Sequence, residues 1–223
     1  MHIVALAGSP HQEKGNTSRL LDIVLQETGE RGIGSETVHL PGGTVLPCRG
    51  CGTCHKKGVC PRDDEMGDIV ERIHAARGLV LASPNYIFNV SAQLKAFLDR
   101  CCGIIHRMAF EGKYGAAVIT SGGGGDEPIA DYLQQSLIAM GVLPVGSVTA
   151  VMGSGQGEPF PDEVAARARQ LGDELASACL GERRFPQMQE RLQEFKGRIR
   201  ALVEANRDIW PYEYEFWQQR KTG

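Results

Sequence analysis

The chain has 223 residues, of which 42% are hydrophobic and 23% charged, as in an ordinary globular protein long enough to bury one large core. Its net charge of −3 at pH 7 gives no electrostatic reason to expect nucleic acid or an anionic membrane as partner. No run of 18 apolar residues occurs, and the short apolar start lacks the features of an export signal. With seven cysteines and no such signal, we expect a cytoplasmic protein whose clustered thiols bind metal or react.

Short apolar runs alternate with longer amphipathic stretches over the first 180 residues, which predicts a parallel sheet with helices on both faces. The short runs predict five strands, at residues 2–7, 35–40, 78–83, 114–120 and 145–152, of which 35–40 is polar enough to be an edge strand. The amphipathic stretches predict helices at about 16–30, 64–76, 91–103, 127–140 and 161–180. The expected architecture is a doubly wound α/β fold in three layers, in which ligands bind beyond the carboxyl ends of the strands.

The first of the loops that follow a strand, residues 8–18, reads Gly-Ser-Pro-His-Gln-Glu-Lys-Gly-Asn-Thr-Ser and leads into a helix. A helix N-terminus offers free N–H groups and about half a positive charge, so this loop is suited to a terminal phosphate. It matches neither the P-loop nor the dinucleotide pattern. The alternative is an ordinary helix cap by Asn16 or Thr17.

The loop after the second predicted strand carries four cysteines in the pattern C-x2-C-x2-C-x5-C-P, namely Cys48, Cys51, Cys54 and Cys60. Such tight spacing lets one turning loop direct several thiolates at a single metal centre, and it is close to a bacterial iron–sulfur run. We expect a [4Fe–4S] cluster. A four-cysteine zinc site and metal-free redox thiols remain alternatives. Asp63-Asp64 is interpreted as the cap of the next helix.

The other cysteines and two histidines are expected to have no special role. Cys101, Cys102 and Cys179 fall in predicted helices, where a lone cysteine usually behaves as a small buried hydrophobe. His55 and His106 could donate protons, but isolated surface histidines are the favoured interpretation.

Two further loops suit a flat ligand. Residues 83–90 read Ser-Pro-Asn-Tyr-Ile-Phe-Asn-Val and combine aromatic rings with amides, although the rings could instead fold into the core. Residues 121–125 read Ser-Gly-Gly-Gly-Gly, which permits close approach of a ligand but is also simply flexible. Because every such loop follows a strand, all of them should gather at one edge of the sheet.

The composition changes after residue 180. Residues 186–209 predict one more helix, and 210–217 place five aromatic side chains in eight residues. We expect a main domain over 1–180, with the metal loop at 47–62, and a helical and aromatic extension over 181–223. So many exposed aromatics would cost solubility, so the tail should be ordered with most of them buried, preferably on a neighbouring subunit.

Together these motifs resemble the iron–sulfur flavoprotein branch of the NADPH-dependent FMN reductase family, from Met1 to about Cys179. The resemblance is carried by the first loop, the cysteine pattern, Asp63–Met66, Ser83–Tyr86, Ala92–Arg100 and the Ser121 glycine loop. It implies a flavodoxin-like fold, with an inserted cysteine loop after the second strand and a C-terminal helical extension.

The resemblance also implies the ligands of two cofactors, FMN and a [4Fe–4S] cluster. The FMN phosphate would be held by Ser9, Asn16, Thr17 and Ser18, with His11 where a basic residue is common. The isoalloxazine ring would be lined by Pro84, Asn85, Tyr86, Phe88, Asn89, Ser121 and Gly122. Asn85 departs from the usual aliphatic residue beside the flavin. The cluster would be held by Cys48, Cys51, Cys54 and Cys60.

The implied function is that of an oxidoreductase, working as a homodimer or homotetramer. It would pass electrons between a ferredoxin or NAD(P)H and an acceptor such as a quinone or an oxygen species. A second hypothesis is a dehydrogenase or reductase of one organic, biosynthetic substrate. A third is a non-catalytic four-cysteine metal-binding or redox-sensor protein.

Overall fold

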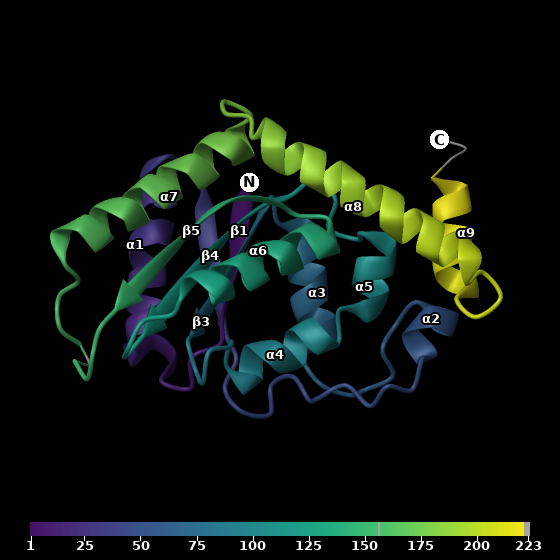
Figure 1. The fold of residues 1–223 in the computed structure, drawn as a ribbon, viewed down its shortest axis with the longest axis horizontal. Helices are drawn as coiled ribbons and strands as arrows, with labels where there is room; N and C mark the ends of the chain where they lie inside the picture. The colour runs from purple at the N-terminus through teal and green to yellow at the C-terminus, as the bar shows by residue number, and fades with distance from the viewer. Residues whose placement is uncertain (156, 221–223) are drawn as a thin grey trace.

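The computed structural model describes residues 1–155 and 157–220, and its centre is a five-stranded parallel sheet (Figure 1). The strands lie in the order β2-β1-β3-β4-β5, which is the doubly wound, flavodoxin-like order. Each begins and ends within two residues of its predicted bounds: β1 His2–Ala7, β2 Gly34–His39, β3 Gly78–Pro84, β4 Tyr114–Ser121 and β5 Leu143–Val151. The predicted fold class is therefore confirmed.

Helices cover both faces of the sheet because the side chains of each strand alternate between them. In β1, Val4 and Leu6 face one core, whereas Ile3 and Ala5 face the other. The second face is covered by α1 Asn16–Glu30 and α7 Asp162–Leu180. The first is covered by α3 Met66–Ala75, α4 Ala92–Asp99, α5 Cys102–Arg107 and α6 Glu127–Met140. The result is the predicted arrangement of three layers.

The two edges of the sheet differ. All residues of the central strand β3 are buried, whereas β2 buries only Val38 and pairs with β1 alone. Its polar sequence had suggested an edge position. At the other edge, the extension helix α8 Pro186–Ala205 packs against β5.

The helix predicted at 91–103 is broken into α4 and α5. The break falls at Arg100 and Cys101, because the buried Arg100 side chain turns inward to form an ion pair with the buried carboxylate of Asp64. Asp64 also accepts the N–H of Met66, the first residue of α3, at 3.2 Å, but Glu65 holds the cap position without a side-chain cap hydrogen bond, so the interpretation of Asp63-Asp64 as the cap is wrong. After the break, α5 packs against the cysteine-rich segment and the extension.

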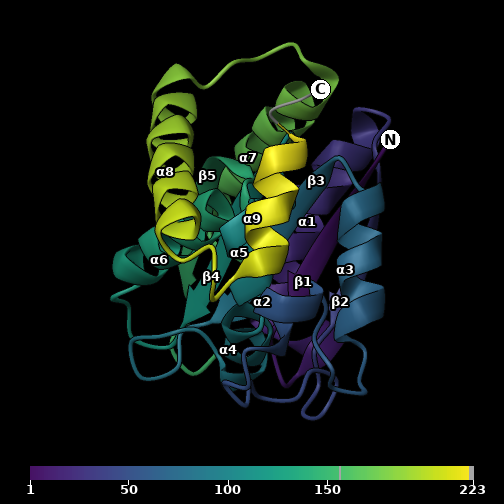
Figure 2. The ribbon, with the colours of Figure 1, turned by 90° about the vertical axis from the view of Figure 1, so that its right-hand side faces the viewer.

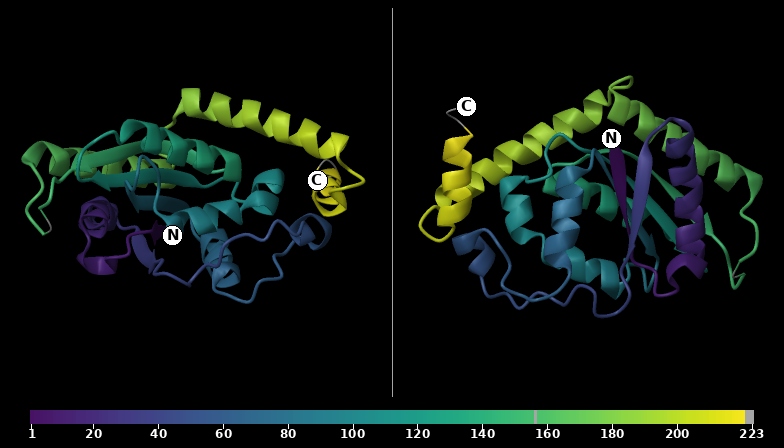
Figure 3. Two further views of the ribbon diagram at one scale, coloured as in Figure 1. Left: turned by 60° about the horizontal axis from the view of Figure 1, so that its bottom comes forward. Right: turned by 180° about the vertical axis from the view of Figure 1, so that it is seen from behind.

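The C-terminal extension consists of two helices rather than one. The first, α8, ends at Ala205, four residues before the predicted end, and a second, α9 Pro211–Gln219, turns back against α5 (Figure 2). A short helix that the sequence did not predict, α2 Thr53–Lys57, lies next to α9. The cysteine-rich segment runs from the end of β2 away from the sheet to α2, beside the C-terminal extension (Figure 3).

The aromatic tail is ordered, but it docks on its own chain. Trp217 is only 4% exposed and donates its indole N–H to the carbonyl of His106 at 2.8 Å. The preferred expectation of docking on a neighbouring subunit is therefore wrong for this ring. Within the single chain, Tyr212 is exposed and the other three rings are partly buried against the core of the extension, so burial of most aromatics on a neighbouring subunit stays a prediction. The guanidinium of Arg107 lies over the rings of Tyr212 and Phe216. This cation–π contact stabilises the two rings although they remain partly open to solvent.

Within the described residues, the structure has no helix long and apolar enough to cross a bilayer.

Candidate functional site

A cleft of about 230 Å³ lies at the carboxyl edge of the sheet, where the loops after β1, β3, β4 and β5 meet. Doubly wound sheets bind their ligands at this edge. Its lining includes nine of the twelve residues for which flavin contact is predicted: Ser9, His11, Asn16, Thr17, Pro84, Asn85, Tyr86, Ser121 and Gly122. The sequence patterns did not indicate the rest of the lining: Thr120, Met152, Gly153, Ser154 and Gly155. The Gly-Ser-Gly run directly after β5 was an available signal.

The other three predicted residues, Ser18, Phe88 and Asn89, lie outside this lining. The buried Ser18 hydroxyl donates to the carbonyl of Gln12 at 2.6 Å. Phe88 is 79% exposed, and the Asn89 side chain accepts the N–H of Val90 at 2.8 Å. In the single chain these residues shape the loops around the cleft.

The helix α1 begins at the cleft without a side-chain cap among the described residues. The alternative interpretation of Asn16 or Thr17 as an N-cap is therefore wrong. The first N–H groups of a helix have no partner inside it, and with the positive end of the helix dipole they attract a phosphate. A Cβ atom on Gly15 would lie 2.7 Å from the Ser9 hydroxyl, so the tight approach of the first loop requires glycine.

Side chains at this helix start join three loops. The amide of Asn16 donates to the carbonyl of Gly155 at 2.8 Å, and its oxygen accepts the N–H of Gly157 at 3.2 Å. The hydroxyls of Thr17 and Thr120 are hydrogen-bonded at 2.7 Å. The loops after β1, β4 and β5 are thus fixed to each other around the cleft.

The described lining contains no lysine or arginine, and its one histidine, His11, is exposed. An anion here would be held by N–H groups and hydroxyls rather than by full positive charges.

The four cysteines of the predicted cluster all carry free thiols in a loop held open by glycines. Gly50, Gly52 and Gly58 have φ values of 63°, 68° and 76°, a left-handed conformation that glycine adopts without strain. The N–H of Gly50 lies 3.4 Å from the sulfur of Cys48. A hydrogen bond between Cys51 and Thr53 lowers the pKa of the Cys51 thiol, which favours the thiolate that binds metal.

The four sulfurs of this loop are not gathered closely enough to bind one metal ion. Among the described residues, no three of these four sulfurs lie as close together as the ligands of one mononuclear metal. A cube of iron and sulfide holds its four thiolates farther apart than one zinc ion does. The guanidinium of Arg100 faces Cys60, where it can offset thiolate charge.

Comparison with known proteins identifies the family. The sequence profile described as NADPH-dependent FMN reductase matches residues 1–157. The chain belongs to the NADPH-dependent FMN reductase family. An "Iron-sulfur flavoprotein" of Archaeoglobus fulgidus is 35% identical over 99% of both chains. The apo structure of an NADH:FMN oxidoreductase, EMOB, has a TM-score of 0.61 at 26% identity, covering 79% of this chain and 89% of that one. A WrbA-like flavodoxin from Agrobacterium tumefaciens shares the fold, with a TM-score of 0.57 at 14% identity over 82% and 98% of the two chains.

This member of the FMN reductase family, a flavin oxidoreductase family, fixes the loops after β3 and β4 to each other through Asp126. The amide of Asn85 donates to one carboxylate oxygen at 2.8 Å, and the hydroxyl of Ser121 donates to the other at 2.8 Å. Asp126 is only 2% exposed, and the sequence analysis missed it. Asn85, which stands where an aliphatic residue is usual, therefore joins the loops after β3 and β4.

The histidines expected to be isolated at the surface are in fact paired. The rings of His55 and His106 stack with centroids 4.9 Å apart, and His106 is only 7% exposed. Burial, with the nearby His55, lowers the pKa of His106 to about 4, so the ring is neutral at pH 7. Cys102 lies beside both rings, which corrects its interpretation as an inert hydrophobe; Cys101 and Cys179 are buried as expected.

Proposed function

We propose that this chain is an FMN-dependent oxidoreductase with a [4Fe–4S] cluster on Cys48, Cys51, Cys54 and Cys60. It would pass electrons between a ferredoxin or NAD(P)H and an acceptor such as a quinone or an oxygen species. The observation that carries the proposal is the uncapped start of α1 at a cleft formed by four strand-end loops. Bound FMN would exchange electrons in pairs or singly, and the cluster would exchange them singly.

The residues of the chain would bind and orient the flavin. The first N–H groups of α1, with the hydroxyls of Ser9 and Thr17, would hold the phosphate. The Asn85–Asp126–Ser121 hydrogen bonds would keep the loops on the ring side at a constant separation. Pro84 and Tyr86 also line the cleft and would contact the ring.

We further propose that the active form is a homodimer or homotetramer. No cysteine is part of the described lining of the cleft, so one chain does not join the two cofactor sites directly. At the cleft rim, Ile87 is 92% and Phe88 is 79% exposed, and both have left-handed backbone angles. A left-handed backbone is strained in residues other than glycine, so these two exposed apolar side chains are kept at the surface at a cost in free energy. Such a surface suits contact with a second copy of the chain, which would also cover the cleft. The seven free thiols suit a reducing compartment, the cytoplasm.

Anaerobic purification followed by flavin, iron and sulfide analysis tests the cofactors. We expect about one FMN, four iron and four sulfide per chain. Stoichiometric zinc without sulfide would instead support a structural four-cysteine site, and absence of flavin would refute the cleft assignment. Stopped-flow mixing of the oxidised protein with NADPH, NADH or reduced ferredoxin then identifies the donor.

A further inference from the structure

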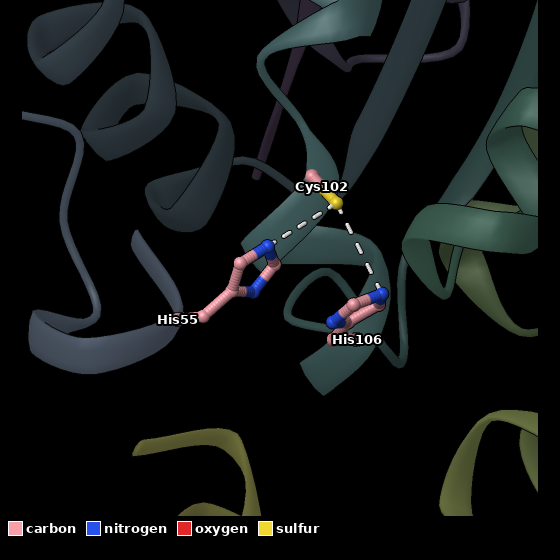
Figure 4. Close-up of side chains that lie close together, drawn as sticks. All are labelled: His55, Cys102 and His106. Atoms are coloured by element: carbon pink, nitrogen blue, oxygen red, sulfur yellow. Dashed lines mark hydrogen bonds between the residues drawn. The ribbon is translucent and has the colours of Figure 1, made fainter. Parts of the chain in front are cut away.

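Three side chains that no motif connects come together beneath the C-terminal extension. His55 comes from α2 in the cysteine-rich segment, and Cys102 and His106 come from α5 (Figure 4). The Cys102 sulfur lies 3.7 Å from Nε2 of His55 and 3.9 Å from Nε2 of His106, and all three atoms lie within 4.8 Å of one another.

The two sulfur–nitrogen separations are close to those of a tetrahedral zinc site. With Zn–S of about 2.3 Å and Zn–N of about 2.0–2.1 Å, a sulfur and a nitrogen bound to the same ion lie about 3.6 Å apart. The two Nε2 atoms lie within 4.8 Å of each other and would move to about 3.3 Å apart on binding, which requires the two rings to rotate. Imidazole nitrogen and thiolate sulfur are also the ligand types that zinc prefers.

A buried carboxylate lies on the far side of both rings. Oε1 of Glu213 lies 2.7 Å from Nδ1 of His55 and 3.9 Å from Nδ1 of His106. Each ring thus directs Nε2 at the sulfur and Nδ1 at Glu213. A carboxylate behind a ligand histidine is the usual second partner at metal sites, where it fixes the tautomer and the ring orientation.

The same four residues contain polar atoms without partners. Glu213 is 0% exposed, and its Oε2, like Nδ1 of His106, has no hydrogen-bond partner among the described residues. Leaving such groups unpaired in the interior costs free energy. A divalent cation on the Nε2 side would offset the buried negative charge and would hold both rings against Glu213.

We propose that His55, Cys102 and His106 bind one Zn²⁺ ion, with solvent as the fourth ligand and Glu213 orienting the histidines. The site uses none of the four cysteines, although His55 lies in their loop and directly follows Cys54. It joins segments from three parts of the chain: the cysteine-rich segment, α5 and, through Glu213, α9. The ion would thereby attach the C-terminal extension to the loop that carries the cluster.

X-ray absorption at the zinc K-edge tests the site in the holoprotein, because iron does not contribute at this edge. Anaerobically purified protein is washed with a chelator, given one equivalent of Zn²⁺ and desalted. We expect about one zinc per chain with unchanged iron, one sulfur neighbour at about 2.3 Å and two imidazole nitrogens at about 2.0–2.1 Å. Fewer than about 0.1 zinc per chain would overturn the proposal, as would a shell of four sulfurs, which would place zinc in the cysteine loop.

Variants locate the ligands. Cys102→Ala and His106→Gln should reduce zinc affinity at least about 100-fold, and Glu213→Gln about 10- to 100-fold, measured by competition with a chromophoric chelator. Cys179→Ala and His74→Gln, which alter a cysteine and a histidine elsewhere, should retain wild-type affinity. Wild-type affinity in Cys102→Ala would overturn the proposal. Should His106→Gln fail to fold, Glu213→Gln and the wild-type K-edge spectrum still decide.

Discussion

The cleft at the strand ends and the cysteine side of the molecule are built in different ways. Four loops, each directly after a strand, form the cleft, and hydrogen bonds such as that of Thr17 to Thr120 lock them together. The cysteine side instead combines a segment after β2, the broken helix α4–α5 and a C-terminal helix. A parallel sheet places the first site through its topology alone, whereas the second depends on packing between distant segments. A substitution that disrupts one of the two sites should therefore leave cofactor binding at the other largely unchanged.

The sharpest test of this independence is removal of a cluster ligand. Cys54→Ser and Cys60→Ser should each lose most of their iron and sulfide, and the broad absorption near 400 nm, because each removes one of four thiolates. FMN content should remain near one per chain. Cys179→Ser, in a buried cysteine far from the loop, should keep both cofactors. Full iron in Cys60→Ser would contradict the proposed ligand set.

The reverse test removes the phosphate contacts in the cleft. Ser9→Ala combined with Thr17→Val should lower FMN affinity by about 100-fold or more, since each charge-assisted hydrogen bond contributes about 1.5–3 kcal/mol. Riboflavin lacks the phosphate, so its affinity should change little, and iron content should be unaffected. Ser136→Ala, on an exposed helix face, is the control. Equal losses for FMN and riboflavin would argue against a phosphate site.

Loss of the Arg100 charge should strongly lower the free energy of unfolding, because Arg100 forms a buried ion pair with Asp64. Arg100→Met leaves the Asp64 carboxylate unpaired and should destabilise the fold by about 3–5 kcal/mol in urea unfolding. Lys95→Met breaks the exposed Lys95–Asp99 pair and should cost less than about 0.5 kcal/mol. Similar losses in the two variants would contradict this account.

The same ion pair should give stability a pH dependence. Burial alone would raise the pKa of Asp64, but the N–H of Leu46 and the guanidinium of Arg100 hold it below its usual value. A lowered folded-state pKa contributes stability above about pH 4, and that contribution is lost as the pH falls further. The difference in unfolding free energy between wild type and Asp64→Asn should therefore shrink below about pH 4. A difference that does not change with pH would refute this role.

The smallest expected effect concerns the contact of the tail with α5. Trp217→Phe keeps an aromatic ring but leaves the buried carbonyl of His106 without its donor, so stability should fall by about 1–3 kcal/mol. Flavin content should stay the same. Trp210→Phe, whose ring is half-buried, should cost less. Loss of FMN in Trp217→Phe would show that the two sides are coupled after all.

The elements that could be predicted from the sequence are those with a local signal. Apolar runs located four of the strands, a more polar run located β2, and a helix start after β1 located the cleft, because all of these depend on neighbouring residues. The break at Arg100 could not be predicted, since it depends on Asp64, 36 residues earlier. The pairing of His55 with Glu213 spans 158 residues, and nothing in either local sequence indicates the other. Asp126 was missed for a similar reason, because the amide that it binds lies on a different loop.

The polar strand β2 also affects how the protein avoids aggregation. An exposed sheet edge can recruit a strand from another molecule and so begin a fibre, and charged side chains are a common defence. Glu36 of β2 lies within 3.8 Å of Arg72 and 4.0 Å of His2, so this edge carries charges of both signs. The opposite edge is shielded by α8. Open-ended growth through the sheet is thus disfavoured at both edges.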